Sequence, residues 1–247
     1  MSGEGLMSGI ATGGRTGGRD VSVTAGGRSR AVIVGVAPVV LLAAFIAHPD
    51  IGLGPPDEAA IASAAASNTF RWGISHLMVG VASALLLLAF VAIRSYLREA
   101  GDDRWSALAL PFVIFGGTLY AILPGMEFAA LAAAETGDDV RAAQAAVDPW
   151  FIPVIVTSGV TSAIGIMGFA RAVSSVGPSA LGVPRFVVVA LGAMAVARMV
   201  PLTGVQFYVH AAAALIALGP LATTMWRHPR AIRLEREPGG GVGTLQA

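Results

Sequence analysis

The chain has 247 residues, of which 55% are hydrophobic and only 13% are charged, and its mean hydropathy is +0.73. These values lie outside the usual range of soluble domains and predict an integral membrane protein. A formal net charge of +1 argues against a nucleic-acid-binding protein, and the absence of cysteine excludes disulfides, thiolate metal sites and cysteine nucleophiles. Any metal would have to be bound by histidine, carboxylate or methionine side chains.

Both ends of the chain are predicted to be tails. Residues 1–30 are rich in Gly, Ser and Thr and have no apolar periodicity, so they bury too little surface to offset chain entropy and are expected to be disordered. The apolar run 31–47 follows four arginines. The long leader and the large Phe45 before the candidate cleavage site favour a retained first helix over a cleaved signal peptide. Residues 227–247 are charged and then Gly-rich, which predicts a second tail.

Apolar stretches near the length needed to cross a bilayer, about 20 residues, occur six times. The predicted spans cover residues 31–47, 72–96, 105–134, 150–173, 186–202 and 204–226. Pro124 is expected to kink the third span, and Pro201 with Gly204 is expected to make a tight hairpin of the last two. The predicted fold class is therefore all-α, a polytopic integral membrane protein with a six-helix transmembrane bundle over residues 31–226.

Two short helices are expected in the connections between these spans. Pro56 followed by Asp57 and Glu58 is typical of a helix start, and an alanine-rich run follows it. A second short helix is predicted over residues 138–147, with Asp148 expected to cap the fourth span and Trp150 expected at the membrane interface.

The placement of arginine predicts the orientation in the membrane. Arginines gather before the first span, between the second and third, between the fourth and fifth, and after the sixth, whereas the opposite connections are mostly acidic. Because short cytoplasmic segments carry an excess of arginine, both termini are predicted to be cytoplasmic. The expected partner is the lipid bilayer, and the expected location is the plasma membrane. The sequence makes no prediction of the oligomeric state.

Polar residues interrupt the spans at about the same level. Counting 1.5 Å of rise per residue from the cytoplasmic ends places four of them in the outer half of the bilayer, namely His76, Glu127, Arg198 and His210. His48 closes the first span at its outer end. Ionisable residues inside a membrane are costly and usually face the interior of the bundle. We therefore expect these side chains to share one polar chamber that opens toward the outer side.

The sequence leaves several chemistries open for this polar set. In one, Glu127 is a general acid with His76 or His210 as base partner and Arg198 nearby, in a membrane-embedded lyase, cyclase or isomerase. Its small-molecule substrate would be apolar, in a cavity lined by Trp72, Tyr120, Phe128 and Tyr208.

A metal is the alternative chemistry. A Zn, Cu or non-haem Fe site would be formed by His48, His76, His210 and Glu127, or His76 and His210 would hold one haem. Two non-catalytic interpretations remain beside these. The chain would be a small proton-coupled carrier, or a structural or accessory membrane protein in which Glu127 and Arg198 form an ion pair. The sequence does not decide whether a cofactor is bound.

Three short stretches carry a resemblance to a known group of proteins. They are HPD at 48–50, FRWGISH at 70–76 and GMEFAALAAA at 125–134. With them, residues 31–226 resemble the uncharacterised six-helix integral membrane proteins of GC-rich actinobacterial genomes. The resemblance implies a plasma-membrane location and the six-helix plan, and it implies no activity, cofactor or catalytic residue.

Overall fold

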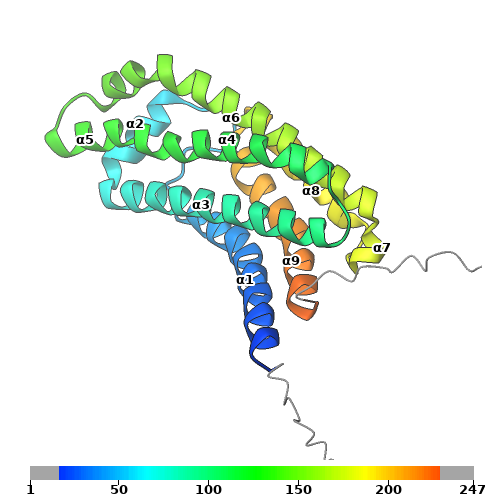
Figure 1. Cartoon of the computed structure of the whole chain (residues 1–247). Coiled ribbons are helices and arrows are strands. Elements are labelled where there is room, and N and C mark those ends of the chain that lie inside the picture. Colours follow the sequence, from blue (N-terminus) through cyan, green and yellow to red (C-terminus); the bar gives the residue numbers. More distant parts are fainter. Residues whose placement is uncertain (1–16, 229–247) are drawn as a thin grey trace, which may run out of the picture.

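The computed structural model describes residues 17–228. Within this range the chain forms helices and no strand, which confirms the all-α class (Figure 1). Five helical segments are long and apolar enough to cross a membrane: Gly27–Ala47, Thr69–Glu99, Trp105–Thr136, Val140–Val176 and Val205–Arg227. A multi-pass membrane protein is thus supported by five long helices, whereas the sequence predicts six.

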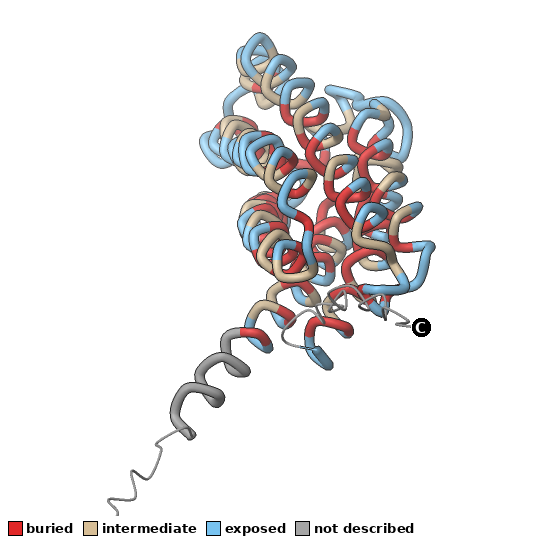
Figure 2. The backbone as a smooth tube through the Cα atoms, turned by 45° about the vertical axis from the view of Figure 1, so that its right-hand side comes forward, coloured by how far each residue is buried: buried red, intermediate tan, exposed pale blue. Residues whose placement is uncertain are grey.

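The helices follow one another with short connections. They are α1 (Gly17–Ala47), α2 (Glu58–Ser67), α3 (Thr69–Glu99), α4 (Trp105–Met126), α5 (Phe128–Thr136), α6 (Val140–Val176), α7 (Pro178–Leu181), α8 (Phe186–Ala197), the π-helical turn η1 (Val205–Val209) and α9 (His210–Arg227). α4 lies along α6, and α1 packs against both α3 and α9 (Figure 1). Buried residues face the space between the helices (Figure 2). Exposed positions carry large apolar side chains such as Leu77 and Val189, as expected of a surface in contact with lipid.

The first helix starts earlier than predicted. α1 begins at Gly17, inside the segment 1–30 for which composition predicts disorder. A helix that has formed over an apolar run extends easily into the preceding residues, because each added residue gains one backbone hydrogen bond. The rest of the tail predictions falls on residues 1–16 and 229–247, which lie outside the described residues.

The third predicted span is interrupted near its C-terminal end. α4 ends at Met126 and α5 starts at Phe128, so Glu127 is the junction residue. Pro124 lacks the backbone N–H that would bond to the carbonyl of the residue four positions earlier, which weakens the last turn of α4. The distortion expected at Pro124 therefore appears three residues later as a break that holds Glu127.

The fourth predicted span and the outer helix predicted over residues 138–147 are one helix, α6. Asp148 does not cap it. Asp139 does so instead, accepting hydrogen bonds from the backbone amides of Arg141 and Ala142, both at 3.0 Å. Pro149 lies inside α6, because one proline removes only one backbone donor and the packing of α6 on its neighbours outweighs that loss.

Of the six predicted spans, the fifth is the one that does not form a helix long enough to cross a membrane. α8 has 12 residues, and it ends at Ala197 instead of reaching residue 202. The chain nevertheless continues to the opposite end of the bundle. Near its start, the hydroxyl of Thr224 in α9 donates to the Gly182 carbonyl (3.2 Å), and beyond its end the Thr203 amide donates to the Gly54 carbonyl (3.0 Å). A proline at 201 explains why this second part is not α-helical.

Basic side chains connect the helix ends at one end of the bundle. Arg30 of α1 forms an ion pair with Glu99 at the end of α3, with Nη1 and Oε1 2.9 Å apart. The Arg28 guanidinium lies 5.6 Å from the centre of the Trp226 ring near the end of α9. Arginines beside the start of α4 and near the end of α6 both lie against the ring of Trp105. The start of the first span and the end of α9 are therefore at the same end of the bundle.

Glycines let α4 and α6 approach each other closely. A Cβ atom on Gly116 would lie 2.6 Å from the backbone nitrogen of Ser162, and one on Gly165 would lie 2.7 Å from that of Val113. The hydroxyl of Ser158 donates to the Gly116 carbonyl at 2.8 Å. This close contact fixes the rotation of α6 and places Ser158 inside the bundle.

Candidate metal centre and adjoining cavities

Two histidines and one carboxylate meet at the end of the bundle opposite Arg28 and Arg30. His48 follows the last residue of α1, His76 lies in α3, and Glu127 separates α4 from α5. One ligand atom from each of the three lies within 4.8 Å of the other two. His48 and His76 are buried, and Glu127 is partly buried. The expected meeting of Glu127 and His76 is confirmed, and His48 joins them.

The end of α1 is held so that His48 turns toward this cluster. Pro49 cannot continue the helix, and the Arg71 side chain reaches across from α3. Its Nε donates to the carbonyl of Ala47 (2.7 Å) and its Nη2 to that of His48 (3.1 Å). The last carbonyls of a helix have no partner within the helix, and a cation is favourable there. Sequence reasoning assigned Arg71 no role beyond topology, because its contact is with a helix more than twenty residues away.

The orientation of both imidazoles is set by backbone carbonyl groups. Nδ1 of His48 lies 2.7 Å from the Pro49 carbonyl oxygen, and Nδ1 of His76 lies 2.7 Å from the Trp72 carbonyl oxygen. A carbonyl oxygen can only accept, so each Nδ1 carries the proton and donates. In the neutral rings both Nε2 atoms then present lone pairs. This arrangement is common for histidines that bind metals, where the partner of the second nitrogen fixes the tautomer and the ring direction.

The contact between His76 and Glu127 requires a shared proton. Nε2 of His76 lies 2.6 Å from Oε2 of Glu127, while Nδ1 of the same ring donates to Trp72. A lone pair on Nε2 and a carboxylate oxygen repel each other at this distance unless a proton lies between them. Two ligands of one metal ion lie further apart, at about 3 Å, so the pair as described shares a proton, which a bound metal ion would replace.

Aromatic side chains enclose the two histidines. The Trp72 ring lies 4.5 Å from the His76 ring and 5.3 Å from the His48 ring, centre to centre, and its Nε1 donates to the Glu127 carbonyl at 3.3 Å. Phe207, in the π-helical turn, meets His48 edge-on at 5.3 Å and stacks on Phe45 at 4.4 Å. π-Helical turns are frequent at functional sites, where they redirect side chains. These rings exclude water from the imidazoles and restrict their rotation.

Burial also sets the charge of His48, which lies just beyond the first membrane span. Burial, together with the neighbouring His76, lowers the pKa of the His48 imidazole below its usual range. The ring is therefore neutral at pH 7, with its Nε2 lone pair available for a ligand.

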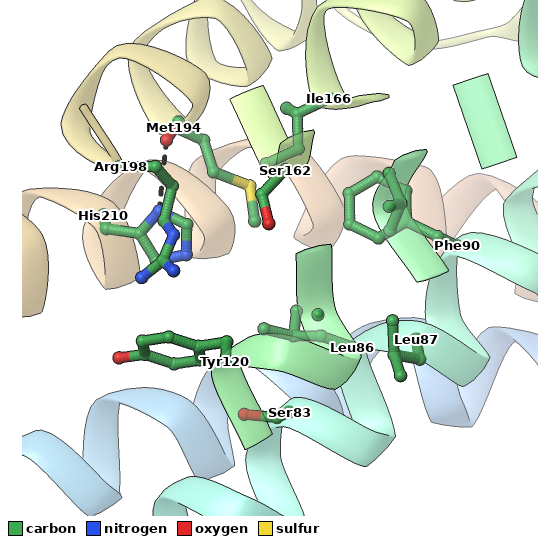
Figure 3. A pocket seen from close by; sticks show the side chains of 12 residues that line it. Ser83, Leu86, Leu87, Phe90, Tyr120, Ser162, Ile166, Met194, Arg198 and His210 are labelled. Carbon is green, nitrogen blue, oxygen red and sulfur yellow. Dashed lines mark hydrogen bonds between the residues drawn. The ribbon is translucent and has the colours of Figure 1, made fainter. Parts of the chain in front are cut away.

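Arg198 and His210 lie away from this cluster and line a separate cavity (Figure 3). The Arg198 guanidinium lies 3.9 Å from the centre of the Tyr120 ring, and its Nη2 donates to the Ser158 hydroxyl at 3.2 Å. His210 donates from Nδ1 to the Met194 carbonyl at 3.1 Å. A cavity of about 40 Å³ between them is lined mainly by apolar side chains.

Two cavities adjoin at Glu127. One, of about 80 Å³, is lined by His48, His76 and Tyr120 among others. The second, of about 410 Å³, is lined by residues of α2, α6, the segment after α8 and η1, and Arg198 is one of them. Both are lined by Glu127 and by Phe207. The His–Glu cluster is thus connected through shared walls to a cavity of ligand size.

The structure divides the predicted polar set. His48, His76 and Glu127 come together, whereas His210 does not join them as a fourth ligand. The predicted ion pair between Glu127 and Arg198 is wrong, because Glu127 pairs with His76. A haem held by His76 and His210 gains no support, because His210 is not part of the His–Glu cluster and lines a different cavity. Of the four aromatic residues expected around a substrate, Tyr120 lines two of the three cavities described above, whereas Trp72, Phe128 and Tyr208 line none of them.

Comparison with protein-family models, with curated proteins and with solved structures found no match to this chain.

Proposed function

We propose that the protein is a metal-dependent enzyme of the membrane, with a divalent metal ion bound by His48, His76 and Glu127. The observation that carries this proposal is the convergence of three ligand atoms from three separate elements within 4.8 Å of one another. Both imidazoles are already directed by backbone carbonyls. Three protein ligands leave a coordination position free, which is typical of catalytic metal sites, whereas structural zinc sites are closed by four.

The donor set indicates which ions fit. Two imidazole nitrogens and one carboxylate oxygen are ligands of Zn²⁺ in hydrolytic enzymes and of Fe²⁺ in non-haem enzymes. Such an ion supplies a Lewis acid for a substrate oxygen or activates a bound water. In this chain His48 and His76 would bind through Nε2 and Glu127 through its carboxylate. Arg71 would hold the end of α1 in position, and the aromatic rings would keep the centre dry.

Proton transfer without a metal is the second candidate. The 2.6 Å separation between His76 and Glu127 suits a carboxylic acid and an imidazole that share one proton. Glu127 would then act as general acid and His76 as its base partner, in a lyase, cyclase or isomerase acting on an apolar substrate. This candidate gives His48 no role, although His48 is oriented as carefully as His76. We therefore place it second.

Metal content distinguishes the two candidates. The protein is produced in medium supplemented with Zn²⁺ or Fe²⁺, purified in detergent without chelator, and analysed for bound elements. We expect one ion per chain to remain after gel filtration. Protein that contains no transition metal, and that also fails to bind added Zn²⁺ or anaerobic Fe²⁺ in a titration, would exclude the metal centre and leave the proton-transfer candidate.

We also propose six membrane passes with both termini in the cytoplasm, in the plasma membrane. α8 with the segment after it would supply the sixth pass. Just before α8, Gly182 is bonded to Thr224 of α9, and beyond α8, Thr203 is bonded to Gly54 at the opposite end of the bundle. An even number of passes agrees with the contact between Arg28 and Trp226, which places both described ends together. The basic end would face the cytoplasm. The metal centre would then lie near the outer surface.

Cysteine labelling tests this orientation, because the chain has no native cysteine. Single cysteines at the exposed positions Ala66 and Ala145 should react with a membrane-impermeant maleimide on intact cells. Cysteines at the exposed positions Asp103 and Ser179 should react only after the cells are permeabilised. The opposite pattern would reverse the topology, and labelling of all four from one side would exclude a membrane-spanning bundle.

A further inference from the structure

The cavity of about 410 Å³ is lined by one arginine, Arg198, which is 6% exposed, and by three carboxylates, Glu58, Glu127 and Asp148. Two of these carboxylates have other partners, because Glu127 pairs with His76 and Glu58 with Arg141. Among the side chains described in residues 27–228, no carboxylate forms an ion pair with Arg198. Its guanidinium has five N–H groups, and its described partners are the Ser158 hydroxyl and the Tyr120 side chain. A buried guanidinium is costly inside a membrane, so its remaining donors are available for an anion.

The cavity runs along α6. Gln144 lines it from one part of this helix, and Gly159, which lies beside the Arg198 carbonyl, lines it from another. Gln144 and Gly159 are about 22 Å apart along the helix at 1.5 Å of rise per residue. The cavity is therefore elongated, with Arg198 toward one end and Gln144 toward the other.

The wall between these polar ends is apolar and open at the side of the bundle. Ile152, Val156 and Met199 line the cavity, and they are 57%, 58% and 50% exposed. Large apolar side chains exposed on a membrane-spanning helix face the hydrocarbon of the bilayer. A molecule can therefore enter this cavity sideways from the membrane.

We propose that this cavity binds an anionic amphiphile, with its acid group on Arg198 and its hydrocarbon chain along α6. Glu127 lines the same cavity, so the bound chain passes beside the His–Glu cluster. Anionic amphiphiles would then be the class of substrate on which the enzyme acts. That last step rests on the proposed metal-dependent function, whereas binding of the amphiphile does not.

Three probes with the same chain and different head groups test this: dodecanoate, dodecyl phosphate and dodecanol. Their binding to the protein in a non-ionic detergent is measured by calorimetric titration. We expect at least one of the two anions to bind more tightly than dodecanol. Arg198→Gln should weaken binding of the anions about 10- to 100-fold, the effect of losing charge-assisted hydrogen bonds, and leave dodecanol unchanged. A preference for dodecanoate indicates a fatty acid, and a preference for dodecyl phosphate indicates a phospholipid head group.

Matched variants separate a specific loss from a folding defect. Arg185→Gln removes an exposed arginine at the other end of α8 and should change no affinity. Val156→Trp fills the apolar entrance and should weaken all three probes, which tests the cavity even if Arg198→Gln does not fold. Equal binding of the anions and dodecanol by the native protein would overturn the inference, and so would native anion affinity in Arg198→Gln.

The same titration in His76→Ala separates this inference from the proposed function. If the native protein binds metal but no probe, the inference is wrong and the metal centre stands. If the native protein binds no metal and His76→Ala still binds the anion with native affinity, the binding site stands and the metal-dependent function is wrong.

Discussion

Replacing His76 with alanine is expected to abolish stoichiometric metal binding, with a loss of affinity of more than about 100-fold. Removing a partner outside the coordination shell already costs about 10- to 100-fold, and His76 would be one of only three ligands. His48→Ala and Glu127→Ala should have effects of the same size. Elemental analysis of the purified variants and titration with Zn²⁺ or Fe²⁺ measure the change.

His210→Ala is the matched control for this prediction. His210 is as buried as His76, with 4% of its surface exposed in both cases, and it also donates from Nδ1 to a backbone carbonyl. It is not part of the cluster, so its replacement should leave the metal content unchanged. Loss of metal in His210→Ala but not in His76→Ala would show that His210, and not His76, binds the metal. Equal loss in both would indicate a general folding defect.

Replacing Trp72 with alanine is expected to lower the free energy of unfolding by about 3 to 5 kcal/mol, the usual effect of removing a large buried aromatic side chain. The Trp72 side chain is fully buried, packs against both cluster histidines and donates to the Glu127 carbonyl. Trp72→Phe keeps most of the ring contacts and loses that hydrogen bond, so its effect should be smaller. Unfolding in a series of denaturing and mild detergent mixtures measures both.

Trp150→Ala provides the comparison at an exposed position. Trp150 is 73% exposed, so removing it creates no cavity and should change the free energy of unfolding by less than about 0.5 kcal/mol. The difference between the two tryptophan variants therefore reports the packing around the cluster. If Trp72→Ala were as stable as Trp150→Ala, the close packing of Trp72 against the histidines would be contradicted.

Much of the local structure was predictable from the sequence, because it depends on contacts within one helix. The high mean hydropathy and the long apolar runs predict membrane-spanning helices, and five segments of that kind are present. The helix start at Asp57 and Glu58 is confirmed, with the Asp57 side chain accepting from the Ala59 amide. The polar positions themselves were visible for the same reason, since a histidine or a carboxylate in an apolar run needs no neighbour to be noticed.

Proline marks where local reasoning stopped being sufficient. Pro124 and Pro149 both lie inside helices, and a proline at either position is expected to interrupt the helix. Of the two helices, only α4 ends close to its proline, Pro124, whereas α6 continues through Pro149. The free energy lost with one backbone donor is similar at both positions, so the packing of the surrounding helices decides the outcome.

The sequence by itself determined an all-helical chain with helices long and apolar enough to cross a membrane, and with histidines, a glutamate and an arginine inside its apolar segments. Only the tertiary structure decided which of them meet. Charge alone favours Glu127 with Arg198, yet Glu127 pairs with His76, and Arg198 stacks on Tyr120. Helical spacing fixes which residues share one face of a helix. Which faces meet depends on how far each helix is rotated and shifted against its neighbour, and close contacts such as Gly116 on Ser162 set that rotation.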